Sequence, residues 1–324
     1  MTLSSALSSQ PFKVDLLSCF QAAEKLKAYR PAPVAEPWAE EPKVDQFVFK
    51  ILFISVCHQM NWDVMQSAMA AYLFPDTYSR LDEFSCIKAS KIDDLLSDYP
   101  KQERVRAAER ARILRETAAR LKQLIPDRNA AERRIAHALL EGPDGFYGFA
   151  AEIDAFTGDP FEKKPRVLAH DLFREKIIPF RDPENLKPAV EYHLIRLYLR
   201  SGRVSTEDET VREVLSGPRL PTRDRLVRLV REAVEDAMRQ TALYAGLDAA
   251  TLNYLEWQIG RAVCVEELDD ATVAKYCLSD ENHDLPDDIR SLCANGCPMN
   301  SFCRKLSDPQ YPWLNEPHFQ KAFY

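Results

Sequence analysis

The chain has 324 residues, which is enough to bury one large hydrophobic core or two modest ones. Hydrophobic residues make up 46% and charged residues 29%, as in an ordinary globular protein, and the low count of 9 glycines favours a helical fold. No apolar run reaches about 18 residues, and no basic segment followed by an apolar one opens the chain. We therefore expect no membrane span, no secretory signal and a cytoplasmic location.

The formal net charge is −7, from 43 Lys and Arg against 50 Asp and Glu. Proteins that hold duplex nucleic acid through its phosphates usually gather cations over one face. A negative total does not exclude such a face, because the distribution of charge matters more than its sum. The charge leaves both a nucleic acid and a small nucleotide open as substrates.

Apolar periodicity predicts a first helix from Phe12 to Tyr29, which Pro31 and Pro33 end. Residues 45–73 contain two apolar helical segments, joined by a polar turn over residues 57–63. The later helices are predicted at residues 90–96, 102–124, 131–140, 167–173, 194–199, 223–244 and 249–260. Asp248 is the expected N-cap of the last of these helices.

The predicted helix 102–124 is rich in arginine, with glutamates interspersed. The arginines are Arg104, Arg106, Arg110, Arg112, Arg115 and Arg120. They could line a nucleic-acid face. The interspersed glutamates instead favour a solvated helix with internal salt bridges.

Four cysteines near the end of the chain could hold one metal centre. Cys293, Cys297 and Cys303 are spaced by four and six residues, so one loop can bring three thiolates together. Cys264 can supply a fourth ligand, and Cys277 is its rival. Zinc and a cubane iron–sulfur cluster both take four cysteines, and the spacing alone does not decide between them. A disulfide framework is the alternative for these cysteines.

The segment Ile259-Gly260-Arg261, then Cys264, then the compact triplet resembles the iron–sulfur loop of the endonuclease III branch of helix-hairpin-helix DNA glycosylases. The later gaps are three and five residues here rather than two and five, and residues 265–292 stretch the first gap to 28. The resemblance implies a [4Fe–4S] cluster rather than zinc. The Gly-Arg context favours Cys264 over Cys277 as the fourth ligand.

A second match covers residues 187–204, where Val190, His193 and Arg196 fit the family pattern. At the place of the family's catalytic aspartate this chain has Glu191, which keeps the carboxylate on a longer side chain. The resemblance implies that Glu191 stabilises positive charge on the sugar or activates water. Tyr192 and His193 are the neighbours expected on the substrate side.

The polar turn after the first apolar segment also resembles the family, whose glutamine in this turn enters the gap left by a flipped base. Gln59 occupies that place, and His58 and Trp62 are expected to face DNA with it. The alternative is a polar connection between two helices, with Trp62 as a core anchor.

Residues 157–162 fall where the family places its hairpin, but they lack its glycine-rich run and include Asp159 and Glu162, which would repel a phosphate. Some members carry a lysine after the hairpin that forms a Schiff base with the sugar. Lys164 matches that position, with Lys163 as the other choice, and exposed lysines at a helix start are the alternative interpretation. Pro165 departs from the family pattern, so we expect a monofunctional enzyme.

The resemblance implies an all-α, two-lobed helix-hairpin-helix glycosylase fold. Residues 1–44 would join the cluster lobe, 45–186 form the helical lobe with the hairpin, 187–305 the catalytic helix and cluster lobe, and 306–324 a tail, with the active cleft between the lobes. The implied function is a monomeric N-glycosylase for a modified or damaged base in double-stranded DNA, in base excision repair or in defence against modified phage DNA. The alternatives are an N-glycosidase for free nucleotides or nucleosides and an inactive nucleic-acid-binding relative.

Overall fold

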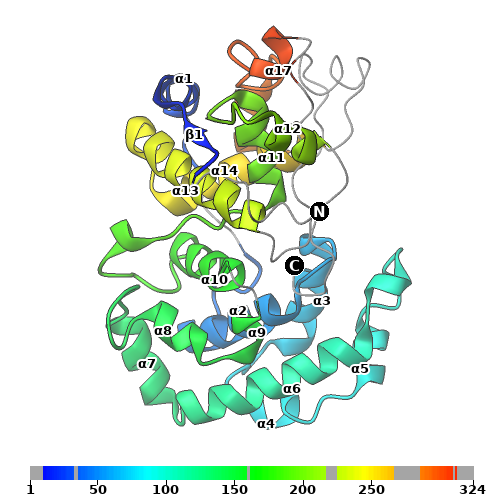
Figure 1. Ribbon diagram of the computed structural model, residues 1–324. Helices are drawn as coiled ribbons and strands as arrows, with labels where there is room; N and C mark the ends of the chain where they lie inside the picture. Colours follow the sequence, from blue (N-terminus) through cyan, green and yellow to red (C-terminus); the bar gives the residue numbers. More distant parts are fainter. Residues whose placement is uncertain are drawn as a thin grey trace. The chain divides into compact units, whose positions relative to one another are not determined.

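The computed structural model describes residues 10–32, 36–158, 161–216, 225–265, 285–308 and 311. These residues are mostly helical, which confirms the predicted helical class (Figure 1). Contacts divide the chain into two compact units. Unit 1 comprises the described residues of 1–33 and 187–321, and unit 2 those of 34–186. No helix in the described ranges combines the length and the apolar character needed to cross a membrane.

Unit 1 is built around three helices that pack on one another, α11, α13 and α14. Its elements are β1 (Lys13–Val14), α1 (Leu16–Leu26), α11 (Tyr192–Ser201), β2 (Val204–Ser205), α12 (Glu209–Ser216), α13 (Arg225–Ala245), α14 (Ala249–Ala262), α16 (Asp287–Arg290), η4 (Ser291–Cys293) and α17 (Arg304–Ser307). As predicted, Asp248 caps α14, because its carboxylate accepts the amide of Thr251. The helix α1 lies along α13, far from it in sequence (Figure 1).

The start of unit 1 differs from the prediction of one helix over residues 12–29. Lys13 and Val14 pair with Ser205 and Val204 in a two-stranded antiparallel ladder. The helix begins only at Leu16, where the Asp15 carboxylate accepts the Ser18 amide at 2.9 Å. Val14 continues the apolar pattern because it packs, partly buried, against the same core as the buried residues of α1.

Unit 2 surrounds one largely apolar helix, α2, on which every residue from Val44 to Val56 is buried, including the polar residues Asp45, Lys50 and Ser55. Its elements are α2 (Lys43–Val56), α3 (Trp62–Leu73), α4 (Leu81–Phe84), α5 (Ala89–Leu95), η2 (Gln102–Arg104), α6 (Ala107–Leu124), α7 (Arg128–Ala136), α8 (Phe146–Ala151), α9 (Asp154–Thr157), α10 (Lys163–Arg174) and η3 (Pro183–Asn185). The helices α3, α6, α7 and α10 all contact α2. The end of α2 therefore carries polar groups that the surrounding helices must satisfy.

Two predicted helices of unit 2 are placed differently in the structure. The segment 102–124 is broken, because Arg106 adopts a left-handed conformation (φ 45°) between η2 and α6. The helix expected over 131–140 is α7, which starts three residues earlier because the Asp127 carboxylate caps it. It ends at Ala136, before the turn at Gly142.

Candidate functional site

Glu191 stands immediately before α11 and is its N-cap. Its Oε1 accepts the amides of His193 at 2.8 Å and Leu194 at 3.3 Å. These are N–H groups that the first turn of a helix leaves without an intrahelical partner. The Glu191 side chain is only 2% exposed. The proposed catalytic carboxylate is thus buried and held in one direction by the backbone of α11.

The next turn of α11 is fastened to α14. The Arg196 guanidinium lies 2.8 Å from Nδ1 of His193 and donates to the Gly260 carbonyl at 3.1 Å. A Cβ atom at Gly260 would stand 2.9 Å from the His193 carbonyl oxygen, so the two helices approach closely there. His193 and Tyr192, both half-buried, have ring centroids 4.1 Å apart.

The same helix contacts two of the four candidate cysteines. Arg196 donates to the Cys264 carbonyl at 2.5 Å, and Nη1 of Arg200 lies 3.8 Å from the Cys264 thiol. The Cys303 thiol in turn donates to the Arg200 carbonyl at 3.3 Å. Cys264 and Cys303, which lie 39 positions apart in the chain, are therefore both held against one turn of α11.

The three later cysteines each open a tight turn. The carbonyls of Cys293, Cys297 and Cys303 accept the amides of Gly296, Asn300 and Leu306, three residues on in each case. Gly296 is left-handed (φ 86°), a conformation that glycine adopts without steric cost. This succession of turns folds the loop compactly and keeps Cys293 and Cys297 in the core of unit 1.

All four candidate ligands are free thiols that belong to unit 1. Burial raises the pKa of Cys293 to about 12 and also raises that of Cys303, whereas a bound metal ion deprotonates its thiol ligands. Within the described ranges, no three His, Cys, Asp or Glu side chains are gathered closely enough to hold a metal ion. The donor set thus has the chemistry of a four-cysteine site without being assembled as one. Cys277 lies outside the described residues.

In unit 2 the predicted DNA-side turn follows α2. Gln59 is half-buried and left-handed (φ 59°), and Asn61 caps α3 by accepting the Val64 amide at 3.1 Å. Trp62 is half-buried and packs edge-on against Phe53, with ring centroids 4.7 Å apart. Trp62 therefore contacts the core, as the structural alternative expected.

Lys164 lies inside unit 2, so the expectation of an exposed lysine at a helix start is wrong. Its side chain is buried, and its ammonium donates to the Ser55 carbonyl at the end of α2, at 2.7 Å. The neighbouring Lys163 is half-buried at the start of α10. Lys164 satisfies one of the carbonyls that the last turn of α2 leaves open.

His58, expected on the DNA side, is buried at 4% exposure. Neither ring nitrogen has a hydrogen-bond partner among the described residues, and the Glu109 carboxylate is 3.9 Å away. Burial, together with the charges of Lys164 and Arg110, lowers the pKa of His58 to about 2. The imidazole is thus neutral at physiological pH.

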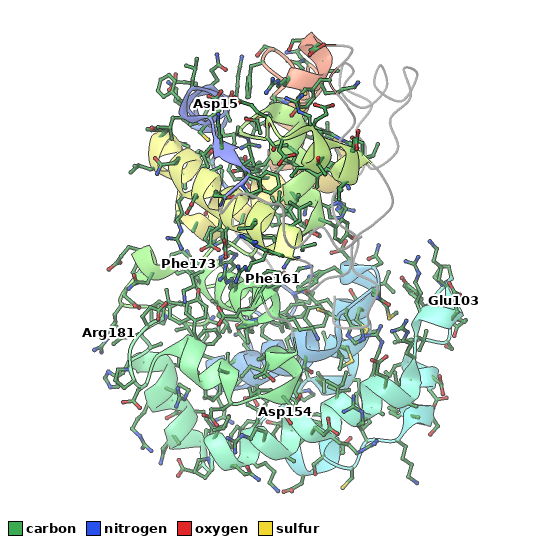
Figure 2. The ribbon with its side chains drawn as sticks, in the orientation of Figure 1. Asp15, Glu103, Asp154, Phe161, Phe173 and Arg181 are labelled. Atoms are coloured by element: carbon green, nitrogen blue, oxygen red, sulfur yellow. The ribbon has the colours of Figure 1, made fainter. Side chains whose placement is uncertain are left out.

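The hairpin region is a short α9 followed by α10, which begins after the left-handed Glu162 (φ 54°). Asp154 is exposed at the start of α9 (Figure 2). Asp159 lies outside the described residues.

Two residues that organise these sites were not singled out from the sequence. Arg200 contacts both cysteine segments, and Arg110 is a fully buried residue that donates to backbone carbonyls around the Gln59 turn. The sequence does contain a pattern that predicts the burial of Arg110. Arg110 shares one helical face with Ala107, Ala111 and Leu114, all of which are buried.

Among known proteins, no family model and no curated protein matches this chain.

Proposed function

We propose that the protein is a DNA N-glycosylase that hydrolyses the bond between deoxyribose and a modified or damaged base. One observation carries this proposal: α11 begins at the buried carboxylate of Glu191 and, through Arg196 and Arg200, contacts the Cys264 segment. The two sequence motifs that resemble the glycosylases are thus joined by one helix.

The chemistry follows from a fixed carboxylate. Cleaving the N-glycosidic bond builds positive charge on the sugar, which a nearby anion stabilises. A water molecule gives a proton to Glu191 and adds its oxygen to the anomeric carbon. The bond to the base breaks, its electron pair leaves with the base, and the base takes a proton from solvent. The amides that hold Oε1 keep the carboxylate from turning away.

The residues proposed to hold a [4Fe–4S] cluster are Cys264, Cys293, Cys297 and Cys303. When bound, the cluster would supply a cross-link between the end of α14 and the loop before α17. Arg200 supports this proposal because it contacts the thiols of both Cys264 and Cys303, the first and last of these cysteines.

We further propose that the enzyme is monofunctional. A Schiff-base lysine must present a neutral amine to the sugar. The Lys164 ammonium instead lies buried and donates to the Ser55 carbonyl, which supports a structural role.

The test is release of free base from a panel of modified-base duplexes and nucleotides. Glu191→Gln keeps an oxygen that can accept the two α11 amides but removes the charge, so base release is expected to fall about 100-fold or more with the fold intact. Glu184→Gln, at an exposed glutamate in η3, is the matched control and should keep full activity. Parental activity in a correctly folded Glu191→Gln protein would refute the assignment. Asp154 would then be the next carboxylate to test.

A second candidate, an N-glycosidase for free nucleotides, is favoured by the arginines of α6. Arg112 bonds Glu116, Arg115 donates to the Ile87 carbonyl, and Arg120 bonds Glu152. Of these three contacts, the Arg112–Glu116 pair is a salt bridge within the helix, as the interspersed glutamates predicted. These cations are engaged within the protein and add little to a phosphate-binding face. The nucleotides in the same panel separate the two candidates.

A further inference from the structure

The turn between α2 and α3 is held by one buried arginine. Arg110 is 0% exposed, and its guanidinium donates to the Val56 carbonyl and to the His58 carbonyl, the latter at 2.8 Å. These two carbonyls lie just before Gln59. Burial lowers the pKa of Arg110 to about 10, so the side chain still carries its charge at neutral pH.

The same guanidinium holds a second junction. Nε donates to the Val105 carbonyl at 2.7 Å, and Nη2 donates to the Arg104 carbonyl at 3.1 Å. These carbonyls precede Arg106, so each of the two junctions contains a left-handed residue that is not glycine. Such conformations are sterically unfavourable and persist only where the surroundings enforce them. The planar fork of arginine suits this task, because it aims several N–H groups at fixed acceptors.

A further hydrogen bond fixes the far side of the turn. The Asn61 amide donates to the Tyr99 hydroxyl at 3.0 Å, while the Asn61 side chain caps α3. Gln59 lies between these restraints and is half-buried. No described residue makes a hydrogen bond to its side-chain amide.

The presence of glutamine rather than glycine at position 59 indicates that its side chain contacts a ligand. A turn that served only to connect two helices would be most stable with glycine at a left-handed position. This chain instead places glutamine there and uses a buried guanidinium to hold the backbone around it. Strain that the surrounding structure enforces is typical of residues that contact a ligand.

We propose that Arg110 is a positioning residue, whose guanidinium holds the backbone from which the Gln59 side chain meets the DNA substrate. Only the second part of this inference, that the Gln59 side chain contacts DNA, rests on the proposed glycosylase function. The first part, that Arg110 orders the turn, can be tested in the free protein.

The first experiment is hydrogen–deuterium exchange of the free protein. In Arg110→Lys, which keeps the charge but loses the fork, exchange in the peptide over residues 56–62 should accelerate about 10-fold, as local opening becomes easier. Arg112→Lys, at an exposed position on the same helix, is the matched control and should exchange like the parent. Tyr99→Phe removes only one bond to the turn and should accelerate exchange in the same direction, which keeps the test open if Arg110→Lys folds poorly. Unchanged exchange over 56–62 in folded variants would overturn the ordering role.

The second experiment measures base release in single-turnover reactions. Gln59→Gly should unfold no more easily than the parent, because it relieves the left-handed strain, yet it should lose about 10-fold in activity. Arg110→Lys should lose about the same factor in the rate of base release. The double variant should be no slower than the less active of the two single variants, because both changes act through the Gln59 side chain. Losses that multiply to about 100-fold would show that Arg110 does not act through Gln59 and would overturn the proposal.

The two experiments can contradict the two parts of the proposal independently. If the parent protein releases no base from any duplex, the proposed function fails together with the role of Gln59 at the substrate. The exchange result still decides whether Arg110 orders the turn.

Discussion

Arg203 and Glu256 in unit 1 are both 0% exposed and form an ion pair, and the Tyr198 hydroxyl donates to the second Glu256 oxygen at 2.6 Å. These buried charges are paired with one another, which is the condition under which charges are tolerated in a core, although Nη2 of Arg203 makes no hydrogen bond among the described residues. His58 in unit 2 is the contrasting case. It is buried beside Lys164 without a hydrogen-bond partner among the described residues, and it must stay neutral.

His58 gives unit 2 a defined acid sensitivity. Its pKa is lowered from 6.5 to about 2 in the folded chain. Between pH 6.5 and pH 2, His58 is therefore protonated in the unfolded chain but neutral in the folded chain. Stability is therefore unaffected by this group above pH 6.5 and falls progressively as the pH is lowered toward 2. At pH 5 the loss should be about 2 kcal/mol.

Urea unfolding at pH 7.5 and pH 5 measures this loss. His58→Gln should remove about 2 kcal/mol of the difference between the two pH values, because glutamine does not titrate. His137→Gln, at an exposed histidine, should leave the difference as it is in the parent. Equal pH dependence in the parent and in His58→Gln would show that His58 is not the responsible group.

At the scale of elements, the contact between α11 and α14 sets the position of the Glu191 carboxylate. A Cβ at Gly260 would meet backbone atoms of His193 at 2.9–3.1 Å, and backbone cannot move aside cheaply. Gly260→Ala should therefore destabilise the protein by roughly 1–3 kcal/mol, less the helix-propensity gain of about 1 kcal/mol. Because His193 donates an amide to Glu191, base release should fall as well.

Gly148→Ala is the matched control for this substitution. Gly148 lies within α8, and the nearest atom to an added Cβ is 4.0 Å away. The control should be neutral or slightly stabilising, through helix propensity alone. Denaturant unfolding of both variants checks the pair. A Gly260→Ala protein as stable as the control would mean that α11 and α14 do not pack at this point.

The sequence was sufficient for elements whose pattern is long and local. Apolar periodicity located α2, α3 and α13, and a capping aspartate located the start of α14. Prediction from the sequence failed where a residue distant in the chain determines the local structure. The two-residue strand β1 exists only through its pairing with β2, and the left-handed Arg106 divides a continuous helical pattern.

The candidate sites show the same division. Glu191, His193 and Arg196 were found because the motif is local, and the structure places all three on one turn of α11 and its cap. The burial of Lys164 was missed because its partner, the Ser55 carbonyl, is 109 residues away in the chain. The sequence pattern of two adjacent lysines indicates solvent exposure, and only the unsatisfied end of α2 explains why one of them is buried.

At the scale of the whole molecule, the four candidate cysteines all belong to unit 1, so loss of a cluster should affect that unit. We expect anaerobically purified protein to be brown, with iron and sulfide in equal amounts. Cys264→Ser should lose the iron because Cys264 and Cys303 share the contact with Arg200, whereas Cys277→Ser should retain it. Cys86→Ser, at an exposed cysteine of unit 2, is the control. A colourless protein with stoichiometric zinc would contradict the cluster.

The charge of the whole chain bears on how it would bind a polymer. The chain has a net charge of −7, and Arg112 and Arg120 of α6 are engaged within unit 2, so α6 adds little to a phosphate-binding face. Each phosphate neutralised on duplex DNA adds about −0.9 to the slope of log affinity against log salt. A protein that holds DNA through few phosphates should therefore have a shallow but non-zero slope.

Affinity for a modified-base duplex, measured by fluorescence anisotropy between 50 and 200 mM salt, checks this expectation. We expect a slope between about −2 and −5, weaker than that of proteins with 6–10 phosphate contacts. Arg112→Met should leave the slope unchanged, because Arg112 is bonded to Glu116 and is not available to a phosphate. A flat response would instead support the free-nucleotide activity, since a single nucleotide releases no condensed counterions when it binds. A steep slope that Arg112→Met reduces by about one would mean that the α6 arginines leave their glutamate partners to bind DNA.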